Sequence, residues 1–217
     1  MIAAWISTNA RCMIGATPSA SLAMRLVCTP RSHFSRKVRL LVDALGLEVE
    51  LCDAGNVAQA NAPAFGPNPL MKVPTLVDDE GRAVFDSDHI AAWLVRRFDP
   101  SDRFAVLTTD TDVLNARAVM NGVMAVEVEL ILAERTGLDT AHARFAKMRA
   151  SLLQGLAWIE TRADVFPQPP SYLGFHLLAL WEHLALYALV PLDYPRLEKR
   201  VAHHAQAWPF AARSRPR

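Results

Sequence analysis

Residues 68–77 read "NPLMKVPTLV", and this stretch decides the fold because a proline stands directly before an apolar run. Pro74 has no backbone N–H to give to a sheet and fixes its own φ, so it suits the first position of a strand. "TLV" is therefore predicted to be a strand, with the charged Lys72 left outside it. "AVF" follows across "DDEGR", which predicts a β-hairpin with its turn around residues 79–81.

The sequence upstream of this hairpin has the pattern of a strand, a helix and a second strand. "RLVCT" (25–29) is a short β-type run, and "EVELC" (48–52) alternates as a half-buried strand does. Between them, apolar residues recur at helical spacing: Val38, Leu41, Val42 and Leu45. The charged residues of this helix fall elsewhere on it: Arg36, Lys37, Arg39 and Asp43. The spacing predicts a βαβ unit with a parallel pair, and Gly46 is suited to end the helix.

The remaining chain divides into the end of this domain and a wholly helical region. Residues 53–68 are predicted to be a loop with a short helix, and residues 87–98 a helix after the hairpin. Four further helices are predicted over residues 111–136, 140–166, 171–190 and 194–208. The expected architecture is an α/β domain over 25–99, a linker over 100–110, an all-α domain over 111–208, and tails at 1–24 and 209–217.

Composition excludes several classes of partner. The net charge of +1 over 217 residues gives no reason to expect a nucleic acid or a membrane surface. The helix over 171–190 is apolar nearly all round, but three ionisable residues interrupt it: His176, Glu182 and His183. They favour a buried central helix over a membrane span. The two histidines are seven residues apart, two turns of helix, which is too far for one metal ion. We therefore expect no metal site.

Cysteine usage and the N-terminal segment bear on location. Three widely spaced cysteines form no metal-binding or redox motif: Cys12, Cys28 and Cys52. Reduced thiols in the cytoplasm are the simplest interpretation. In residues 1–24 the only charge is Arg11, and no apolar run is long enough for a secretory signal. This segment is expected to be a disordered tail outside the fold, with a targeting peptide as the alternative.

Three motifs in the α/β domain indicate a binding site. A proline that opens the strand after the connection in such a domain is often cis, which would leave the Val73 N–H and C=O free to pair with an extended peptide-like ligand. An ordinary trans proline is the alternative. "FDSDHI" (85–90) places Asp86 and Ser87 at a helix start, where they serve either as a cap or as a clamp for an amino acid's ammonium and carboxylate groups.

The third motif is "TPRSHFSRKVR" (29–39), the turn from the first strand into the first helix. Ser32 and Ser35 are both candidate caps. The functional hypothesis is that Ser32 donates its hydroxyl to a bound thiolate. One charge-assisted hydrogen bond of about 1.5–3 kcal/mol lowers a thiol pKa by roughly one to two units from about 8.5. The thiolate then becomes a large fraction of the species at neutral pH.

In this order and architecture, the three motifs resemble the glutathione transferase family from about residue 25 to the end of the chain. The stretches "PRSHFSRKVR", "NPLMKVPTLV" and "FDSDHIAAWL" are most similar to bacterial and plant members that use a serine, including the tau and zeta classes. The resemblance implies a thioredoxin-like first domain and a helical second domain that supplies the pocket for an electrophilic substrate. It also implies a homodimer.

The resemblance assigns roles to five residues, each by its matching motif. It implies that Ser32 is catalytic, that the Val73 backbone pairs with the cysteinyl part of glutathione, and that Lys72 assists at the glycyl carboxylate. It also implies that Asp86 and Ser87 bind the γ-glutamyl end. Glutathione is then the co-substrate and a small hydrophobic electrophile its acceptor. A noncatalytic binding or regulatory protein with this fold is the alternative.

Several residues depart from the family's pattern or fall outside it. His33 follows Ser32 and is expected either to add a donor near the sulfur or to face solvent. In "SYLGF" (171–175) Gly174 stands where the family has an acidic capping residue, so Gly174→Asp is expected to stabilise the helix by about 1 kcal/mol. In the predicted helix over 111–136, three apolar residues recur every four positions: Met120, Met124 and Val128. They either line the pocket for the electrophile or belong to the hydrophobic core. His203 and His204 are expected to be solvated.

Overall fold

The computed structural model describes residues 23–216, so nearly all of the predicted tail over 1–24 lies outside the described residues. Four strands form one sheet in the order β2-β1-β3-β4. They span β1 Arg25–Cys28, β2 Glu50–Asp53, β3 Thr75–Val77 and β4 Ala83–Phe85. β1 and β2 are parallel, whereas the other two pairs are antiparallel. The predicted βαβ unit and the predicted hairpin are both confirmed.

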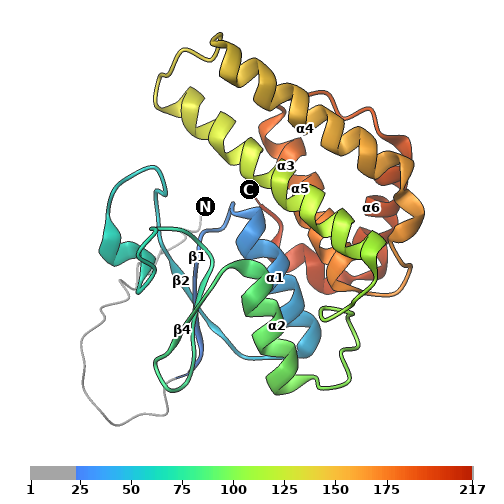
Figure 1. The fold of residues 1–217 in the computed structure, drawn as a ribbon. Helices are drawn as coiled ribbons and strands as arrows, with labels where there is room; N and C mark the ends of the chain where they lie inside the picture. The colour runs from blue at the N-terminus through green and yellow to red at the C-terminus, as the bar shows by residue number, and fades with distance from the viewer. Residues whose placement is uncertain (1–22, 217) are drawn as a thin grey trace, which may run out of the picture.

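The helices fall into two groups, which Figure 1 shows on either side of the domain boundary. The α/β domain carries α1 His33–Leu45, the 3-10 helix η1 Ala62–Phe65, and α2 Ser87–Phe98. The helical domain carries α3 Thr111–Arg135, α4 Ala143–Thr161, η2 Ala163–Val165, α5 Tyr172–Tyr187, α6 Pro195–Ala207 and η3 Pro209–Ser214. The predicted fold class, a thioredoxin-like domain followed by an all-α domain, is confirmed.

Helix α1 is buried on more than the apolar face that its periodicity indicates. Gly46 ends the helix in the left-handed conformation (φ 67°), as expected. Arg36 and Lys37, however, are 1% and 0% exposed. The reason is that α1 packs against α2 in its own domain and against α5 and η3 of the helical domain. Its charged face is therefore an interdomain contact, where Arg36 pairs with Glu182 of α5.

Helix α5 is the buried centre of the helical domain, as predicted. The Ser171 hydroxyl oxygen caps it by accepting from the Gly174 N–H at 3.0 Å. A side chain at Gly174 has no room, because an added Cβ would lie 2.5 Å from Cη2 of the buried Trp208. The stabilisation expected from Gly174→Asp is therefore wrong. Among residues 23–216, no helix combines the length and the apolar character that a bilayer span requires.

The histidines of the helical domain are more buried than expected. His176, His183 and His204 are all buried, whereas His203 is exposed as predicted. The His204 ring stacks on Trp208 with ring centroids 4.1 Å apart. The expectation that His204 is solvated is wrong because α6 turns this residue inward, toward α5 and the segment that follows α6.

Candidate functional site

Ser32 lies at the N-cap of α1, immediately after the turn that leaves β1. Its Oγ accepts a hydrogen bond from the Ser35 N–H at 3.1 Å. A serine hydroxyl has one donor and two acceptor positions, so this cap uses one lone pair and leaves the proton able to donate elsewhere. Ser35, the other candidate, is fully buried. Of the two serines, Ser32 is the cap and the partly exposed one.

Val73 precedes a cis peptide bond to Pro74, so the cis alternative is confirmed. In the part of the chain that the structure describes, neither the N–H nor the C=O of Val73 has a hydrogen-bond partner. The preceding carbonyl is in use, since Lys72 O accepts from Asn68 Nδ2 at 3.0 Å and from Thr75 Oγ1 at 3.3 Å. Val73 therefore presents free backbone donor and acceptor groups, while the Lys72 residue is exposed.

Asp86 and Ser87 begin α2 with an unusual backbone. Asp86 has φ 68° and ψ 136°, a region that non-glycine residues rarely adopt and that costs about 1–3 kcal/mol. Its carboxylate accepts from the Asp88 N–H at 2.8 Å and remains exposed. Ser87 is buried, and its carbonyl accepts from the Tyr172 hydroxyl at 3.2 Å. Strain at an exposed acidic residue is typical of a functional site.

The register of the sheet brings the three motifs together at one end of the strands, and this end of the sheet is called its edge below. Thr75 of β3 is paired with Val27 near the end of β1 and with Phe85 at the end of β4. Ser32 follows β1, Val73 precedes β3, and Asp86 follows β4. Because β3 runs antiparallel to both neighbours, all three positions leave the sheet at the same edge. A serine hydroxyl, a free peptide group and a carboxylate therefore meet where an extended ligand can contact each.

A charged network that sequence reasoning missed lies behind this edge. Asp88, in the first turn of α2, accepts hydrogen bonds from four side chains: Lys37 Nζ at 3.0 Å, Arg117 Nη2 at 3.2 Å, Asn121 Nδ2 at 2.6 Å and Tyr172 Oη at 2.8 Å. These donors come from α1, α3 and α5. The network therefore fixes the start of α2, and with it Asp86, against the helical domain.

Attraction between the Asp88 carboxylate and the positive charges of Lys37 and Arg117 holds the network together, and little of it is exposed to solvent. Burial by itself raises the pKa of the Asp88 carboxyl, but Lys37, His176 and Arg117 together outweigh burial and hold it below its ordinary value. Burial lowers the pKa of the Lys37 ammonium to about 8, against the opposing effect of Asp88. Both pKa values are lowered, which favours the charged form of Asp88 and disfavours that of Lys37; Lys37 is fully buried, whereas the Asp88 side chain is 24% exposed. At neutral pH both groups are ionised.

The His33 ring packs against the helical domain, so the expectation that it faces solvent is wrong, while a role as an added donor near the sulfur stays a prediction. The ring is buried, and its Nε2 lies 3.2 Å from the Met124 carbonyl oxygen of α3. Burial lowers the pKa of His33 well below its ordinary value, with a further contribution from the neighbouring His183. The residue therefore joins the first turn of α1 to the helical domain.

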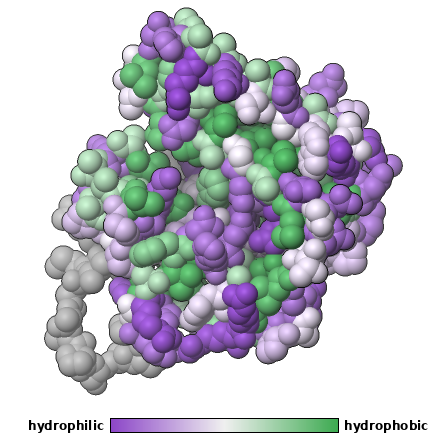
Figure 2. Space-filling view, in the orientation of Figure 1, coloured by the Kyte–Doolittle hydropathy of each residue, from purple (hydrophilic) through white to green (hydrophobic). Residues whose placement is uncertain are grey.

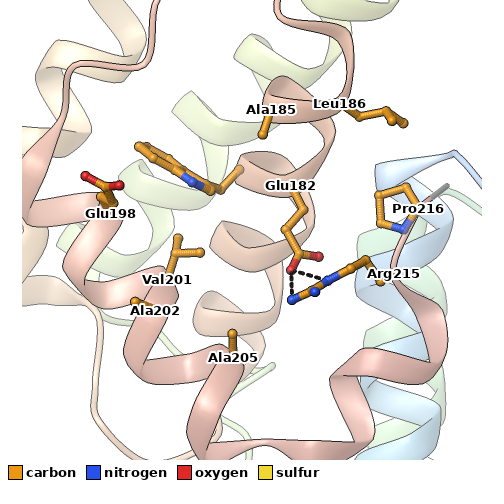
Figure 3. Close-up of a pocket in the computed structure, with 10 residues that line it drawn as sticks. Glu182, Ala185, Leu186, Glu198, Val201, Ala202, Ala205, Arg215 and Pro216 are labelled. Atoms are coloured by element: carbon orange, nitrogen blue, oxygen red, sulfur yellow. Dashed lines mark hydrogen bonds and ion pairs between the residues drawn. The ribbon is translucent and has the colours of Figure 1, made fainter.

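The expected substrate pocket is not formed by the methionine stripe. Met120 and Met124 are both 0% exposed, so the core alternative is confirmed for them. A groove of about 520 Å³ does open on the helical domain, between α5, α6 and the C-terminal segment (Figure 3). Glu182 lies in its wall and accepts from Arg215 at 3.0 Å. No residue of the predicted site lines this groove.

Two further observations concern the hydropathy of the surface and the state of the cysteines. Hydrophobic and hydrophilic residues are interspersed over the face shown in Figure 2. Cys28 and Cys52 are buried, and burial raises the pKa of the Cys28 thiol to about 11. Cys28 is therefore protonated at neutral pH and unsuited to act as a nucleophile.

Comparison with known proteins agrees with this architecture. Residues 26–102 match the family model described as the glutathione S-transferase N-terminal domain. No curated protein sequence matches the chain significantly.

Solved structures with the same fold include three that were crystallised with glutathione or a derivative. The glutathione S-transferase of Methylobacterium radiotolerans, in complex with glutathione sulfonate, is 23% identical, with a TM-score of 0.74 over 90% of this chain and 95% of that one. The glutathione S-transferase of Methylobacillus flagellatus, with glutathione bound, is 21% identical, with a TM-score of 0.77 over 90% and 100%.

The third is a maleylacetoacetate isomerase of Methylobacterium extorquens with malonate and glutathione. It is 22% identical, with a TM-score of 0.63 over 88% of this chain and 96% of that one. At such identities the likeness establishes the fold. Residues 26–102 of this chain match the glutathione S-transferase N-terminal domain model, and the chain as a whole has the fold of the glutathione S-transferase structures.

Proposed function

We propose that this protein is a glutathione transferase that adds the glutathione thiolate to a small hydrophobic electrophile. The observation that carries the proposal is the register of β1, β3 and β4, which brings Ser32, Val73 and Asp86 to one edge. Glutathione is an extended tripeptide with an ammonium, two carboxylates and a thiol, so it offers a complementary group to each. The similar structures crystallised with glutathione or its sulfonate support this ligand.

In the proposed complex each end of glutathione has its own partner. Asp86 pairs with the γ-glutamyl ammonium, and Ser87 at the N-terminus of α2 receives the adjacent carboxylate. The free N–H and C=O of Val73 pair with the cysteinyl peptide group, as at a sheet edge. Lys72, one residue earlier and exposed, is placed to approach the glycyl carboxylate. These contacts direct the thiol toward Ser32.

The proposed reaction uses the thiolate as nucleophile. The thiol proton leaves to solvent when glutathione binds, and the Ser32 hydroxyl donates to the resulting sulfur anion. The sulfur electron pair then forms a bond to an electrophilic carbon, and a leaving group such as chloride departs with its bonding pair. Ser32 lowers the barrier by stabilising the anion before attack.

A conjugation assay distinguishes the enzyme from a noncatalytic binding protein. Purified protein is mixed with glutathione and an activated aryl chloride, and product absorbance is followed above the uncatalysed rate. The enzyme proposal predicts saturable turnover that Ser32→Ala reduces. Glutathione binding without turnover on a panel of aryl halides, epoxides and maleyl compounds would favour the binding protein.

Ser32→Ala should raise the pKa of the bound thiol and slow conjugation at neutral pH. Loss of one charge-assisted hydrogen bond corresponds to roughly one to two pKa units, hence about 10–100-fold in rate where thiolate formation limits turnover. The measurement is thiolate absorbance of bound glutathione against pH. Ser35→Ala is the matched control. If the pKa of the bound thiol rises only in Ser35→Ala, Ser35 and not Ser32 stabilises the thiolate.

Asp86→Asn should weaken glutathione binding by about 10–100-fold. The substitution removes the charge opposite the ammonium, a contact of about 1.5–3 kcal/mol. Asparagine tolerates positive φ and still caps a helix, so the fold should be retained. Calorimetric titration of parent and variant measures the effect. Asp79→Asn, in the hairpin turn, is the control, and equal affinities for Asp86→Asn and the parent would remove Asp86 from the site.

We also propose a homodimer that forms through β4 and α2, and a cytoplasmic location in line with three widely spaced cysteines that form no metal-binding or redox motif. A shallow groove on this face is lined by Val84, His89, Ala92, Trp93, Arg96 and Arg97. Phe85 and Phe98, at the ends of the two elements, are 40% and 38% exposed. Apolar side chains beside arginines are typical of protein interfaces.

Ala92→Glu should convert this dimer to a monomer, because it places a charge inside the groove. Light scattering coupled to size exclusion measures the mass across protein concentration. Leu138→Glu is the control, since Leu138 is 59% exposed and remote in sequence from β4 and α2. A parent protein that is monomeric at all concentrations would rule out the assembly.

A further inference from the structure

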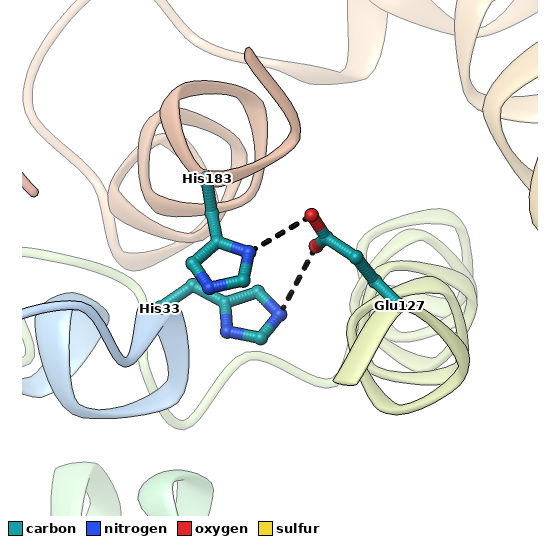
Figure 4. A group of neighbouring side chains, drawn as sticks. All are labelled: His33, Glu127 and His183. Carbon is teal, nitrogen blue, oxygen red and sulfur yellow. Dashed lines mark ion pairs between the residues drawn. The ribbon is translucent and has the colours of Figure 1, made fainter. Parts of the chain in front are cut away.

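Three buried side chains from three helices converge between the domains (Figure 4). They are His33 at the start of α1, Glu127 of α3 and His183 of α5, with exposures of 1%, 0% and 4%. One nitrogen or oxygen atom from each lies within 4.8 Å of the others. None of the three takes part in the glutathione contacts proposed above, so the cluster needs its own account.

Among the described residues the Glu127 carboxylate has no well-aligned hydrogen-bond donor, although His183 lies close enough to lower its pKa in part against the burial that raises it. Oε1 lies 2.9 Å from His183 Nδ1, and Oε2 lies 3.4 Å from His33 Nε2. In the described part of the chain neither oxygen accepts a hydrogen bond, and His183 Nδ1 also lacks a partner. A buried carboxylate without a donor carries a large desolvation penalty, which either a proton or a cation relieves.

The donor set suits a transition-metal cation. Two imidazoles and one carboxylate form a ligand set found in zinc sites. With bonds of 2.0–2.1 Å, ligand atoms of a tetrahedral zinc lie about 3.3 Å apart. The two nitrogen–oxygen separations, 2.9 and 3.4 Å, lie close to this value. The nearby Lys37 charge is paired with Asp88, so with neutral imidazoles and an ionised Glu127 the cluster carries one negative charge and suits a dication; burial raises the pKa of Glu127, so binding of the ion displaces its proton.

Binding requires one ring to turn. The His33 and His183 rings are stacked, with centroids 3.9 Å apart and planes within 4° of parallel, so one ion cannot lie in both ring planes. We expect His183 to be the ring that turns, because its Nδ1 has no aligned hydrogen bond among the described residues, whereas His33 Nε2 faces the Met124 carbonyl at 3.2 Å. On binding, His33 Nε2 gives up any proton it shares with that carbonyl.

We propose that His33, Glu127 and His183 form a site for one divalent transition-metal ion, with Zn²⁺ as the expected occupant. The ion joins α1 of the first domain to α3 and α5 of the second and stabilises their contact. It occupies the position of the missing hydrogen-bond donor to Glu127. The site is distinct from the proposed transferase site, because none of its three ligands is among the residues proposed to contact glutathione.

The test uses the full chain after treatment with a chelator. Zn²⁺ added to a hundredfold excess over its Kd should raise the melting temperature by about 5–10 °C. Calorimetry should show one ion per chain. Co²⁺ in place of Zn²⁺ should give visible ligand-field bands of a nitrogen–oxygen site without thiolate charge transfer. A parent protein with no metal-dependent shift, or cobalt spectra with thiolate bands, would overturn the proposal.

Substitution of the proposed ligands tests where the ion binds. Glu127→Gln and His183→Gln should each weaken zinc binding by about 100-fold or more, since loss of a supporting residue alone costs 10–100-fold. His203→Gln, at an exposed histidine on α6, is the matched control and should bind as the parent does. If a single variant fails to fold, the double variant Glu127→Leu/His183→Leu removes the unpaired carboxylate together with its neighbour. Retention of the zinc shift in that variant would contradict the assignment.

Discussion

Asp88→Asn is expected to lower the free energy of unfolding by about 3–5 kcal/mol, the range found when one partner of a buried ion pair is removed. For a chain of this size that corresponds to about 6–20 °C in melting temperature. The buried Lys37 would lose its counter-ion, and Arg117 would lose its carboxylate partner. Thermal and urea denaturation of parent and variant measure the difference.

Asp79→Asn is the matched control for this substitution. Asp79 pairs with Arg97 at 2.9 Å, but both side chains are exposed, so the expected loss is below about 1 kcal/mol. Equal losses in the two variants would show that the network is no stronger than a surface pair. The double variant Lys37→Met/Asp88→Leu should regain much of the stability, because it removes both charges together.

The Asp88 effect should also depend on pH in a defined sense. Its folded pKa lies below the ordinary value, so its contribution is complete above the unfolded pKa of about 3.9 and is lost as pH falls toward the lower, folded pKa. The gap in stability between parent and Asp88→Asn should therefore be full at pH 5–7. It should narrow below pH 4. A gap that widens in acid would contradict the ionised network.

Gly174→Asp is expected to destabilise the protein by about 2–6 kcal/mol. Overpacking accounts for about 1–3 kcal/mol, and burying an acidic side chain without a donor accounts for at least a similar amount. The new Cβ would lie 2.5 Å from Trp208 Cη2 and 3.3 Å from His204 Nε2. Trp208 cannot move aside easily, because it is 1% exposed and packed against Phe175 and His204.

Gly122→Ala in α3 is the control for the glycine effect. A Cβ at Gly122 meets no atom within 4 Å, so alanine there should stabilise the helix by about 0.5–1 kcal/mol. Differential scanning calorimetry of the two variants should give shifts of opposite sign. A Gly174→Asp protein that melts at or above the parent would show that the contact with Trp208 is not as close as described.

The strands and helices of this protein follow from local sequence signals. Pro74 stands directly before "TLV", which is β3. The alternating "EVELC" (48–52) overlaps β2, which runs one residue further, and Gly46 ends α1 where expected. Ser32, Val73 and Asp86 could be chosen as site candidates because each lies at a strand or helix end, where backbone groups are free for ligands. Pairing of the strands then brings these ends together.

Contacts between distant segments could not be predicted in the same way. Periodicity identified the apolar face of α1 but not its second buried face, since Lys37 meets Asp88 51 residues away and Asn121 84 residues away. The position of His33 next to Ser32 suggests a place near the bound sulfur or in solvent, whereas its partners lie on α3 and α5. The Gly174 prediction used cap chemistry alone, and the obstacle is a tryptophan from beyond α6.

Calorimetric titration of the purified chain with glutathione tests the central claim most directly. We predict saturable binding of one glutathione per chain, with an affinity that Asp86→Asn reduces about 10–100-fold and Asp79→Asn leaves unchanged. Thermal denaturation of the same samples shows that each variant is folded. A folded parent protein that takes up no glutathione would contradict the claim that Ser32, Val73 and Asp86 form a glutathione site.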